Sequence, residues 1–229
     1  RRKNVAEAVG KFSILKTLQA FSDAQVTVLV VDASEGLVDQ DLHVMSHIVN
    51  AGRALVIAIN KWDGLDNDYK KGIKEVLERR LAFNDFAEIR FISALHGTGV
   101  GELYQSVDTA YQAATQKLST NELTKILEKA VFDHAPPLVA GRRIKLRYAH
   151  AGGQNPPIII IHGNQTDAVP KHYTRYLEKT FRKTLNLFGT PIRVEYRTGD
   201  NPYAGKKNKL TARQVSKRRR MIKHIGKKK

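Results

Sequence analysis

The strongest constraint on the fold is a run of six apolar residues, 54–59 (ALVIAI), followed directly by the motif NKWD at 60–63. The run is short for a helix and lacks the alternation of a half-buried strand. It therefore predicts a strand buried on both faces of a parallel sheet. Open α/β sheets bind ligands at the carboxyl ends of their strands. The NKWD motif is thus predicted to lie where a ligand binds.

The acidic residue of this motif, Asp63, suits a guanine base. Its carboxylate would accept hydrogen bonds from the ring N1–H and from the exocyclic 2-amino group, whereas adenine would leave it unpaired. The alternative is a polar turn at the start of a helix, in which Asp63 before Gly64 makes a local hydrogen bond. The four-residue motif alone does not distinguish these two alternatives, so the neighbouring sequence has to decide between them.

A second loop supplies that context. Residues 88–92 (EIRFI) predict another strand, which is followed by Ser93, Ala94 and Leu95. This loop would reach the same edge of the sheet, where the backbone N–H groups of Ser93 and Ala94 would donate to the guanine O6 atom. The motif in this context favours guanine recognition over a local turn.

Residues 1–116 alternate between helix and strand patterns. After an amphipathic opening helix, strands are predicted at 26–31, 54–59 and 88–92, the first two of them buried, and each is followed by a helical pattern, at about 40–49, 69–81 and 101–114. This order predicts parallel pairing with right-handed crossovers. The first part of the chain is therefore expected to be α/β, as part of a doubly wound nucleotide-binding domain.

The composition excludes several other classes. The sequence has no cysteine, so it has no disulfide framework and no thiolate metal site. His43 and His47 stand one helical turn apart, but the HExxH glutamate and a third ligand are missing, so no metal site is expected. Neither a membrane span nor a signal peptide is evident. We expect a soluble, cytoplasmic, monomeric protein.

Residues 117–204 follow a different pattern. The order of predicted elements is a helix at about 121–131, strands at 143–148 and 158–161, a helix that begins at Pro170, and a last strand at 192–197. In the first of these strands Ile144, Leu146 and Tyr148 are expected to face the core. The order α-β-β-α-β predicts a small α+β domain with two helices on one face of a three-stranded sheet.

Positive charge is concentrated in the second half of the chain. The net charge is +17, yet acidic residues outnumber basic ones in 1–116, and residues 205–229 hold twelve Lys and Arg with no acidic residue. This tail is expected to be disordered when free, and phosphate binding is favoured over a merely solvated tail. The candidate RNA-binding residues are Arg143, Lys145 and Arg147 on the strand, Lys171, Arg175 and Lys179 on the helix, and Lys217, Arg218, Arg219 and Arg220 in the tail.

The α-β-β-α-β order is similar to a K-homology RNA-binding domain. The GXXG loop with which such domains clamp a nucleic-acid backbone is missing, since Gly152 and Gly153 are adjacent. Two interpretations stay open: the basic faces bind RNA without that groove, or the domain chiefly packs against residues 1–116.

Several motifs together resemble one family. NKWD, DASEGL, SALHGTGVG, RRIKLRYAHAGGQNPPIIIIHGN and NPYAGKKNKLT resemble the Der, or EngA, family of bacterial tandem-domain ribosome-assembly GTPases. The resemblance implies that residues 1–116 are the later part of a P-loop GTPase domain, 117–204 a K-homology-like domain and 205–229 a basic tail. It implies GTP or GDP as ligand, and GTP hydrolysis coupled to assembly of the large ribosomal subunit through its ribosomal RNA.

The resemblance also implies roles for residues of the two loops. Asn60 would brace the nucleotide pocket, the stem of Lys61 would cover the base, and Asp63 would bind guanine. Ser93 and Ala94 would complete the base site. Trp62 and Leu95 belong to the same two motifs and are counted among the expected GTP-binding residues.

Three motifs of the family are missing from this sequence. The phosphate-binding loop GxxxxGKS, the switch threonine and the DxxG motif hold the phosphates and Mg²⁺ and position the attacking water. We therefore expect no catalytic residue in this chain and no GTP hydrolysis by it alone, as for the C-terminal portion of a longer protein. The alternative is a stand-alone basic RNA-binding module with a vestigial nucleotide fold and no enzymatic activity.

Overall fold

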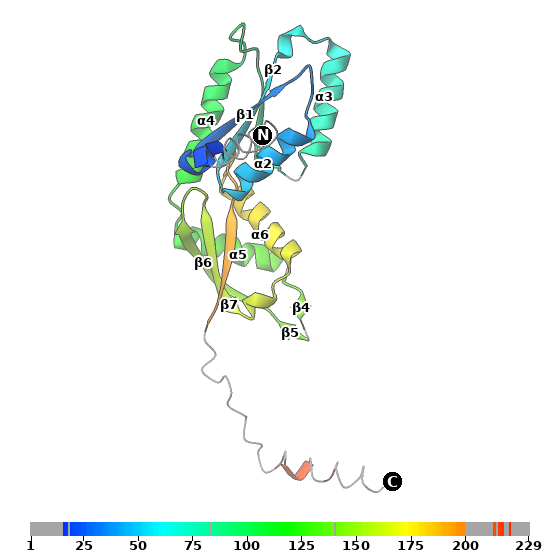
Figure 1. Ribbon diagram of the computed structural model, residues 1–229. Helices are drawn as coiled ribbons and strands as arrows, with labels where there is room; N and C mark the ends of the chain where they lie inside the picture. Colours follow the sequence, from blue (N-terminus) through cyan, green and yellow to red (C-terminus); the bar gives the residue numbers. More distant parts are fainter. Residues whose placement is uncertain are drawn as a thin grey trace, which may run out of the picture. The chain divides into compact units, whose positions relative to one another are not determined.

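The computed structural model describes residues 16–17, 19–82, 84–139, 141–199, 213, 215–217 and 220 (Figure 1). Most of the expected opening helix lies outside these ranges, and its described residues up to Asp23 are helical. The chain forms two compact units, one up to Thr198 and one from Gly199. Disorder was expected for residues 205–229. The five of these residues that the structure describes are helical, and the others lie outside the described ranges.

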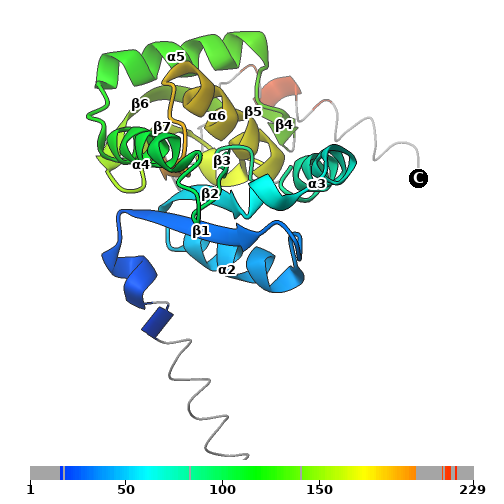
Figure 2. The ribbon, with the colours of Figure 1, turned by 90° about the horizontal axis from the view of Figure 1, so that it is seen from above.

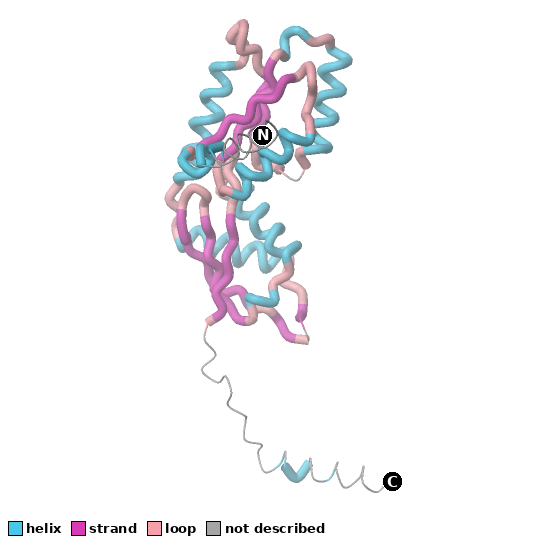
Figure 3. The backbone as a smooth tube through the Cα atoms, in the orientation of Figure 1, coloured by secondary structure: helices cyan, strands magenta, loops and turns pink. Residues whose placement is uncertain are grey.

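A parallel three-stranded sheet organises the first part of the chain. Strands β1 (Val26–Asp32), β2 (Ala54–Asn60) and β3 (Glu88–Phe91) lie side by side in that order (Figure 3). The connecting helices are α2 (Asp39–Asn50), α3 (Asn67–Arg80) and α4 (Val100–Thr115), with a short 3₁₀ turn, η1 (Trp62–Gly64), after β2. The predicted alternation of strand and helix is confirmed.

Strand β2 is buried on both faces, as its unbroken apolar sequence predicts. Leu55, Ile57 and Ile59 pack in one cluster with residues of α2 and α3, whereas Ala54 and Val56 pack against Ala110 and Ala114 of α4. Figure 2 shows these three helices around the strands of the sheet. All six apolar residues are at most 1% exposed. The NKWD motif therefore follows the most completely buried strand of this sheet.

The prediction that β1 is a fully buried strand is wrong. Val28 is 37% exposed and Val30 is 57% exposed. The reason is that β1 lies at the edge of the sheet, beside β2 only. An apolar run does not reveal whether a strand is central or at an edge.

The second part of the chain has the predicted α-β-β-α-β order. Helix α5 (Thr120–Asp133) precedes β6 (Lys145–Gly153) and β7 (Ile158–Asn164), and α6 (Lys171–Thr184) precedes β8 (Arg193–Thr198). In the sheet β6-β7-β8, β7 pairs antiparallel with β6 and parallel with β8. Both helices pack on one face, and the core includes Leu123, Leu127, Ile159, Ile161, Leu177 and Phe181. Two short elements were not predicted: a hairpin of β4 (Leu138–Val139) and β5 (Arg142–Arg143), and the 3₁₀ turn η2 (Thr166–Ala168).

The predicted alternation along the first strand of this sheet is corrected in the structure. The register shifts between Leu146 and Tyr148, so that Arg147 occupies a β-bulge. After the bulge the two faces exchange: Ala149 is fully buried in the core, and Tyr148 is 43% exposed on the opposite face. A single inserted residue reverses every side chain that follows it.

The two parts of the chain contact each other within one unit. The loop between α6 and β8 joins the first sheet, because Leu55 N–H donates to Gly189 O at 2.7 Å and Gly189 N–H donates to Phe86 O at 2.8 Å. The guanidinium of Arg182 binds Asp85 at 2.5 Å, and that of Arg193 donates to Asn50 O at 2.5 Å. The second domain therefore packs against the first, and this contact does not exclude RNA binding by other faces of the second domain.

Candidate functional site

The two predicted loops lie together at the carboxyl end of the first sheet. Asn60 ends β2, and Ser93 follows β3, which pairs with β2 in parallel register. The side-chain oxygen of Asn60 accepts a hydrogen bond from Ala94 N–H at 2.9 Å, so it ties one loop to the other. This geometry fits the expected bracing role of Asn60.

Asp63 faces the second loop. A hydrogen bond from the Ser93 hydroxyl lowers the pKa of its carboxyl group, with smaller contributions from a backbone N–H and from the charges of His96 and Lys70. His96 Nε2 lies 3.2 Å from Asp63 Oδ2. The Asp63 side chain remains 40% exposed, so an ionised acceptor with two oxygens is both oriented and accessible.

Lys61 is held above the neighbouring strand. Its ammonium group pairs with Asp32 at 2.5 Å, and Asp32 also accepts from the backbone N–H and hydroxyl of Ser34. The Lys61 hydrogen bond, followed by those of Ser34, lowers the pKa of Asp32 to about 2, and the pKa of Lys61 is raised by the same pair. Lys61 has a left-handed backbone with φ of 62°, which turns the chain sharply between Asn60 and Asp63.

Two predicted donors to a guanine O6 atom are already paired within the protein. Ser93 N–H donates to Thr98 O at 2.9 Å, and Ala94 N–H donates to Asn60 as described. The structure therefore gives Ser93 a different role, because its hydroxyl orients the carboxylate of Asp63. Donation from these two N–H groups to a guanine O6 atom remains a prediction, and in this structure both are paired within the protein.

Trp62 belongs to the motif but does not line the base pocket. Its ring packs on Phe91 with a centroid distance of 4.2 Å, and the ammonium groups of Lys70 and Lys74 lie 5.8 and 5.9 Å from its centre. It also contacts the apolar cluster under β2. The structure thus makes Trp62 a support for the loop, whereas the sequence motif suggested a ligand contact.

A pocket of about 320 Å³ opens between the two loops, and its lining comprises Asn60, Lys61, Asp63, Gly64, Ser93 and Leu95. These groups fit a guanine base: a carboxylate that can accept from N1–H and the 2-amino group, the Lys61 stem, and the apolar side chain of Leu95, which is 87% exposed. Phosphate and Mg²⁺ contacts are not supplied by these residues.

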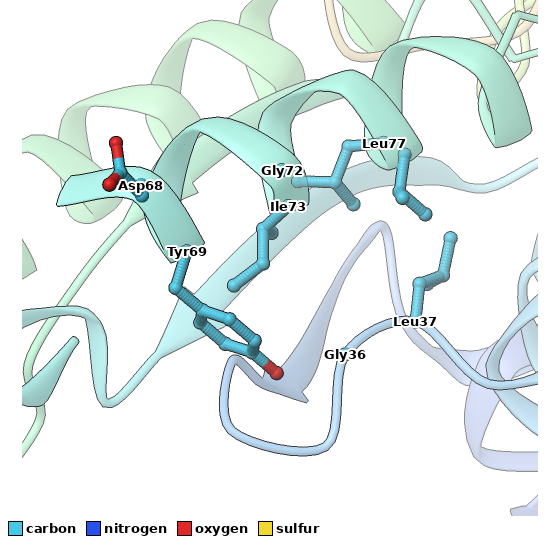
Figure 4. A pocket seen from close by; sticks show the side chains of 8 residues that line it. Gly36, Leu37, Asp68, Tyr69, Gly72, Ile73 and Leu77 are labelled. Carbon is cyan, nitrogen blue, oxygen red and sulfur yellow. The ribbon is translucent and has the colours of Figure 1, made fainter. Parts of the chain in front are cut away.

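A second pocket, of about 330 Å³, lies beside this site (Figure 4). It runs between α3 and the loop after β1, and its lining is mainly apolar, with Leu37, Ile73 and Leu77. Tyr69 points across it toward that loop, where its hydroxyl donates to Ser34 O at 3.3 Å. Asp68 is also part of the lining, but its carboxylate points away from the loop in Figure 4, so the space between α3 and that loop is mainly apolar and is not assigned as the base site.

The predicted basic residues are distributed over separate surfaces. Lys171, Arg175 and Lys179 are exposed along one side of α6, as their spacing predicts, although Lys179 lies 3.9 Å from Asp85. The expected row on the strand does not form, because Arg143 lies in β5, Lys145 in β6 and Arg147 in the bulge. In the tail, Lys217 and Arg220 are exposed, and Arg218 and Arg219 lie outside the described residues.

Sequence reasoning did not assign Asp32, Ser34 and His96 to the site. Asp32 ends a strand and stands in register with Asn60, so the parallel pairing of the two strands was a signal that could have found it. The contact of His96 with Asp63 depends on the path of a loop, for which the sequence carries no comparable signal.

His43 and His47 are exposed on α2, and the described part of the chain contains no group of three or more His, Asp or Glu side chains that could hold a metal ion. Among the described helices, none is long and apolar enough to cross a membrane.

Two protein families match the chain. Residues 117–197 match the KH-domain-like family of EngA bacterial GTPase enzymes, C-terminal, and residues 12–113 match the elongation factor Tu GTP-binding domain. A crystal structure of Aquifex aeolicus Era bound to GDP and AlF4⁻ is 17% identical with a TM-score of 0.37, and covers 79% of this chain and 67% of that chain.

Curated relatives match over nearly all of the chain. It is 67% identical to GTPase Der of Teredinibacter turnerae over 229 residues, and 66% identical to GTPase Der of Saccharophagus degradans over 220 residues. The matches cover 100% and 96% of this chain but 49% and 47% of those proteins, so the chain spans about half the length of the relatives that it matches. The partial GTPase fold, the K-homology-like domain and these identities together show that the chain belongs to the Der, or EngA, family of bacterial GTPases.

Proposed function

We propose that this chain is the guanine-recognising and RNA-contacting part of a cytoplasmic GTPase that acts in assembly of the large ribosomal subunit. The observation that carries the proposal is the pocket between the loops after β2 and β3, where Asp63 presents an oriented, accessible carboxylate. The identity of 67% to a protein named GTPase Der supports the enzymatic class.

Base recognition follows from the chain's own groups. Asp63 would accept from the N1–H and 2-amino groups of guanine, and Ser93 would hold the carboxylate ionised and in place. Asn60 fixes the distance between the loops through Ala94. Lys61, anchored by Asp32, presents its aliphatic stem to the pocket. An adenine base would leave the carboxylate without donors, so selection for guanine is expected to be strong.

Hydrolysis is proposed for the full-length protein only. Phosphoryl transfer depends on groups that hold the phosphates and Mg²⁺ and that position water, and the sequence of this chain contains no GxxxxGKS. The relatives are about twice as long. The exposed edge of β1, with Val28 and Val30, is where further strands of the nucleotide-binding sheet would add.

Nucleotide calorimetry tests whether this chain supplies the base contacts while tight binding and hydrolysis require the full-length protein. The full-length protein should bind GDP far more tightly than ADP, whereas residues 1–229 alone should bind GDP weakly, because base contacts without phosphate contacts are weak. Residues 1–229 should also release no phosphate from GTP. Submicromolar GDP binding by residues 1–229 would contradict the proposal.

The RNA contact is proposed from charge. Residues 205–229 carry 12 of the 39 basic residues and no acidic residue, and α6 presents an exposed basic side. Each phosphate contact releases about 0.7 to 0.9 of a counterion, so binding to structured ribosomal RNA should weaken steeply with salt. If about half of the tail's charges contact phosphate, deleting the tail should reduce the slope of log K against log salt by about 4 to 5.

Anisotropy measurements with structured ribosomal RNA at several salt concentrations test the tail. The comparison variant is the triple change of Lys171, Arg175 and Lys179 to Gln, which removes the charge of α6 and leaves the tail intact. An unchanged slope after tail deletion, with a reduced slope in the triple variant, would assign the contact to α6.

The second candidate function is a stand-alone RNA-binding module without nucleotide. It is favoured by one observation, the lack of the phosphate-binding loop in the sequence. It predicts that the full-length protein binds neither GDP nor GTP while its affinity for RNA is intact. The same calorimetry therefore separates the two candidates.

A further inference from the structure

The K-homology-like sheet has a face that its two helices do not cover. Helices α5 and α6 pack on the side of Ile159, Ile161 and Val194, behind the strands in Figure 1. The opposite face is formed by alternate residues of the three strands. This uncovered sheet face comprises Lys145, Tyr148 and His150 of β6, Ile158, Ile160, His162 and Asn164 of β7, and Arg193, Glu195 and Arg197 of β8.

One row across this face joins two rings and a guanidinium. Tyr148 stands opposite His162 in the β6–β7 pair, and His162 stands opposite Arg197 in the β7–β8 pair. The Tyr148 and His162 rings are stacked, with centroids 4.5 Å apart and planes 6° apart. The β-bulge at Arg147 creates this row, since without it Tyr148 would point into the core.

A third ring, that of His150 in the next row opposite Ile160, joins these two rings in a small ring ladder. His150 Nε2 lies 3.1 Å from His162 Nε2, a hydrogen-bonding distance that one neutral tautomer of each ring satisfies. Burial, followed by the charges of His150 and Arg197, lowers the pKa of His162, so that its ring is neutral at physiological pH. Partly exposed stacked rings, such as those of Tyr148 and His162, are the kind of surface on which nucleic-acid bases stack.

Next to the ring ladder the face is apolar and level. Ile160 is only 5% exposed although it points away from the helices, because it lies over Gly152: a Cβ atom at Gly152 would come within 2.6 Å of Ile160 Cδ1. Ile158 lies over Gly153 in the same way, at 3.2 Å. The adjacent glycines, which do not form a GXXG loop, therefore keep this part of the face flat.

The charge beside the ring ladder is complementary to a phosphate backbone. Within the described part of the chain the guanidinium of Arg197 has no hydrogen-bond or ion-pair partner, and Lys145 is exposed at the same end of the face. Glu195 is the one acidic residue of the face and stands in the next row, opposite Ile160. Soon after β8 the sequence enters the tail with its twelve basic residues.

We propose that this uncovered face binds single-stranded RNA, with a base stacked on the ring ladder of Tyr148 and His162 and a phosphate bound by Arg197. The proposal rests on the RNA contact proposed above and specifies its form. It assigns base stacking to the open side of the sheet, away from α5 and α6. Stacking requires unpaired bases, so a duplex of the same charge should gain only the electrostatic part of the binding.

The first measurement is fluorescence anisotropy with a labelled twelve-nucleotide uridine oligomer and with a labelled twelve-base-pair RNA duplex. Tyr148→Ala should weaken binding of the single strand about tenfold, which corresponds to about 1.4 kcal/mol, with the salt slope unchanged because no charge is lost. Duplex binding should hardly change. Tyr148→Phe keeps the ring and should restore single-strand affinity. Arg197→Gln should instead lower the salt slope by about 0.7.

Tyr104→Ala is the matched control, because Tyr104 is 69% exposed on α4, away from this face. It should leave single-strand binding unchanged. Thermal unfolding of each variant shows whether the ring ladder only stabilises the sheet, since a merely structural role would lower the melting temperature and weaken both probes together.

Three results would overturn the inference: equal loss on single strand and duplex, no loss in Tyr148→Ala, or no recovery in Tyr148→Phe. If the wild-type chain binds neither probe at low salt, the proposed RNA contact itself fails. If it binds both and Tyr148→Ala is silent, only the stacking site fails. Failure of the inference and failure of the proposed function are therefore distinguishable.

Discussion

Asp63 is oriented by a neighbour that the sequence motif does not contain. The Ser93 hydroxyl is the largest cause of its lowered pKa, and it comes from the loop after β3. Through this hydrogen bond Ser93 would act as a positioning residue for the proposed contact of Asp63 with guanine. Its removal should change the titration of Asp63 before it changes the fold.

We expect Ser93→Ala to raise the pKa of Asp63 toward its ordinary value. The full-length variant should also bind GDP more weakly, because a carboxylate that is free to rotate pairs less well with N1–H and the 2-amino group. Carboxyl-carbon NMR titration gives the pKa, and calorimetry gives the affinity. Ser46→Ala, an exposed serine on α2, is the control. An unshifted Asp63 pKa in Ser93→Ala would remove Ser93 from this role.

The Asp32–Lys61 pair predicts a specific dependence of stability on pH. The folded-state pKa of Asp32 is about 2, below its ordinary 3.8, so the pair contributes stability above that ordinary value and loses it as pH falls toward 2. The raised pKa of Lys61 adds a second loss only at high pH. The contribution is therefore steady around neutral pH.

Lys61→Met tests this pair. The difference in unfolding free energy between the wild type and the variant should be constant from about pH 5 to pH 8 and should shrink below about pH 4. The pKa of Asp32 should rise only part of the way to 3.8, because Ser34 still donates to it. A difference that does not change down to pH 2 would show that the pair is not formed in solution.

Among the elements, β6 was predicted as a strand from its sequence, but its β-bulge was not. Its alternating residues predicted a half-buried strand, and a strand is there. The bulge at Arg147 left no trace in the alternation, so Tyr148 was placed in the core and the cationic row of Arg143, Lys145 and Arg147 was expected on one face. The position of the bulge is set by the pairing of β6 with β7. It cannot be predicted from the sequence of β6 alone, because that sequence does not identify the partner strand.

The element order and the two site loops were predictable for a related reason. Parallel sheets between helices give long, unbroken apolar runs, and loops that follow such strands meet at one edge. The edge position of β1, the support role of Trp62 and the use of the Ser93 hydroxyl depend on neighbours that are distant in sequence. These features are fixed by tertiary contacts, which the local sequence does not encode in a readable pattern.

The pairing of β6 with β7 requires a glycine at 163. A Cβ atom there would overlap the carbonyl oxygen of Lys145, which is backbone and has no rotamer with which to move away. Gly163→Ala should therefore lower the free energy of unfolding by about 1 to 3 kcal/mol. Urea denaturation measures the loss.

Gly101→Ala is the control for that substitution. Gly101 lies in the first turn of α4 with no atom within 4 Å of its Cβ position, so alanine there should be neutral or stabilising by up to about 1 kcal/mol. Equal stability of the two variants would mean that β6 and β7 separate enough to admit the methyl group.

At the scale of the whole molecule, Gly189 joins the two domains. It bonds to Phe86 and Leu55 of the first domain through its backbone, has φ of 74°, and would place a Cβ atom 2.5 Å from Ala110 Cβ. Both its conformation and its closeness to α4 exclude a side chain. The junction therefore depends on a residue with no side chain of its own.

Gly189→Ala should destabilise the chain more than Gly36→Ala does. Gly36 has φ of 72° but no atom within 4 Å, so alanine there carries only the backbone strain, about 1 to 2 kcal/mol. The excess loss in Gly189→Ala measures the clash with Ala110, and hydrogen exchange should locate the opening at the amide groups of Leu55 and of residue 189, which donate the two junction hydrogen bonds. Equal losses in the two variants would show that the contact with α4 is not maintained.

In the proposed function, the loops of this chain select the base of a nucleotide whose phosphates the rest of the full-length protein binds. The measurement that tests it most directly is the affinity of the full-length protein for GDP and for xanthosine diphosphate, before and after Asp63→Asn. An amide offers one donor and one acceptor, which match the 2-oxo group and N1–H of xanthine, whereas guanine presents two donors.

We expect at least about tenfold weaker GDP binding in Asp63→Asn, since each lost charge-assisted hydrogen bond is worth about 1.5 to 3 kcal/mol, together with tighter binding of xanthosine diphosphate. Asp108→Asn, an exposed carboxylate on α4, should change neither affinity. Unchanged GDP affinity in Asp63→Asn, without a gain for xanthosine diphosphate, would contradict the claim that this chain carries the guanine site.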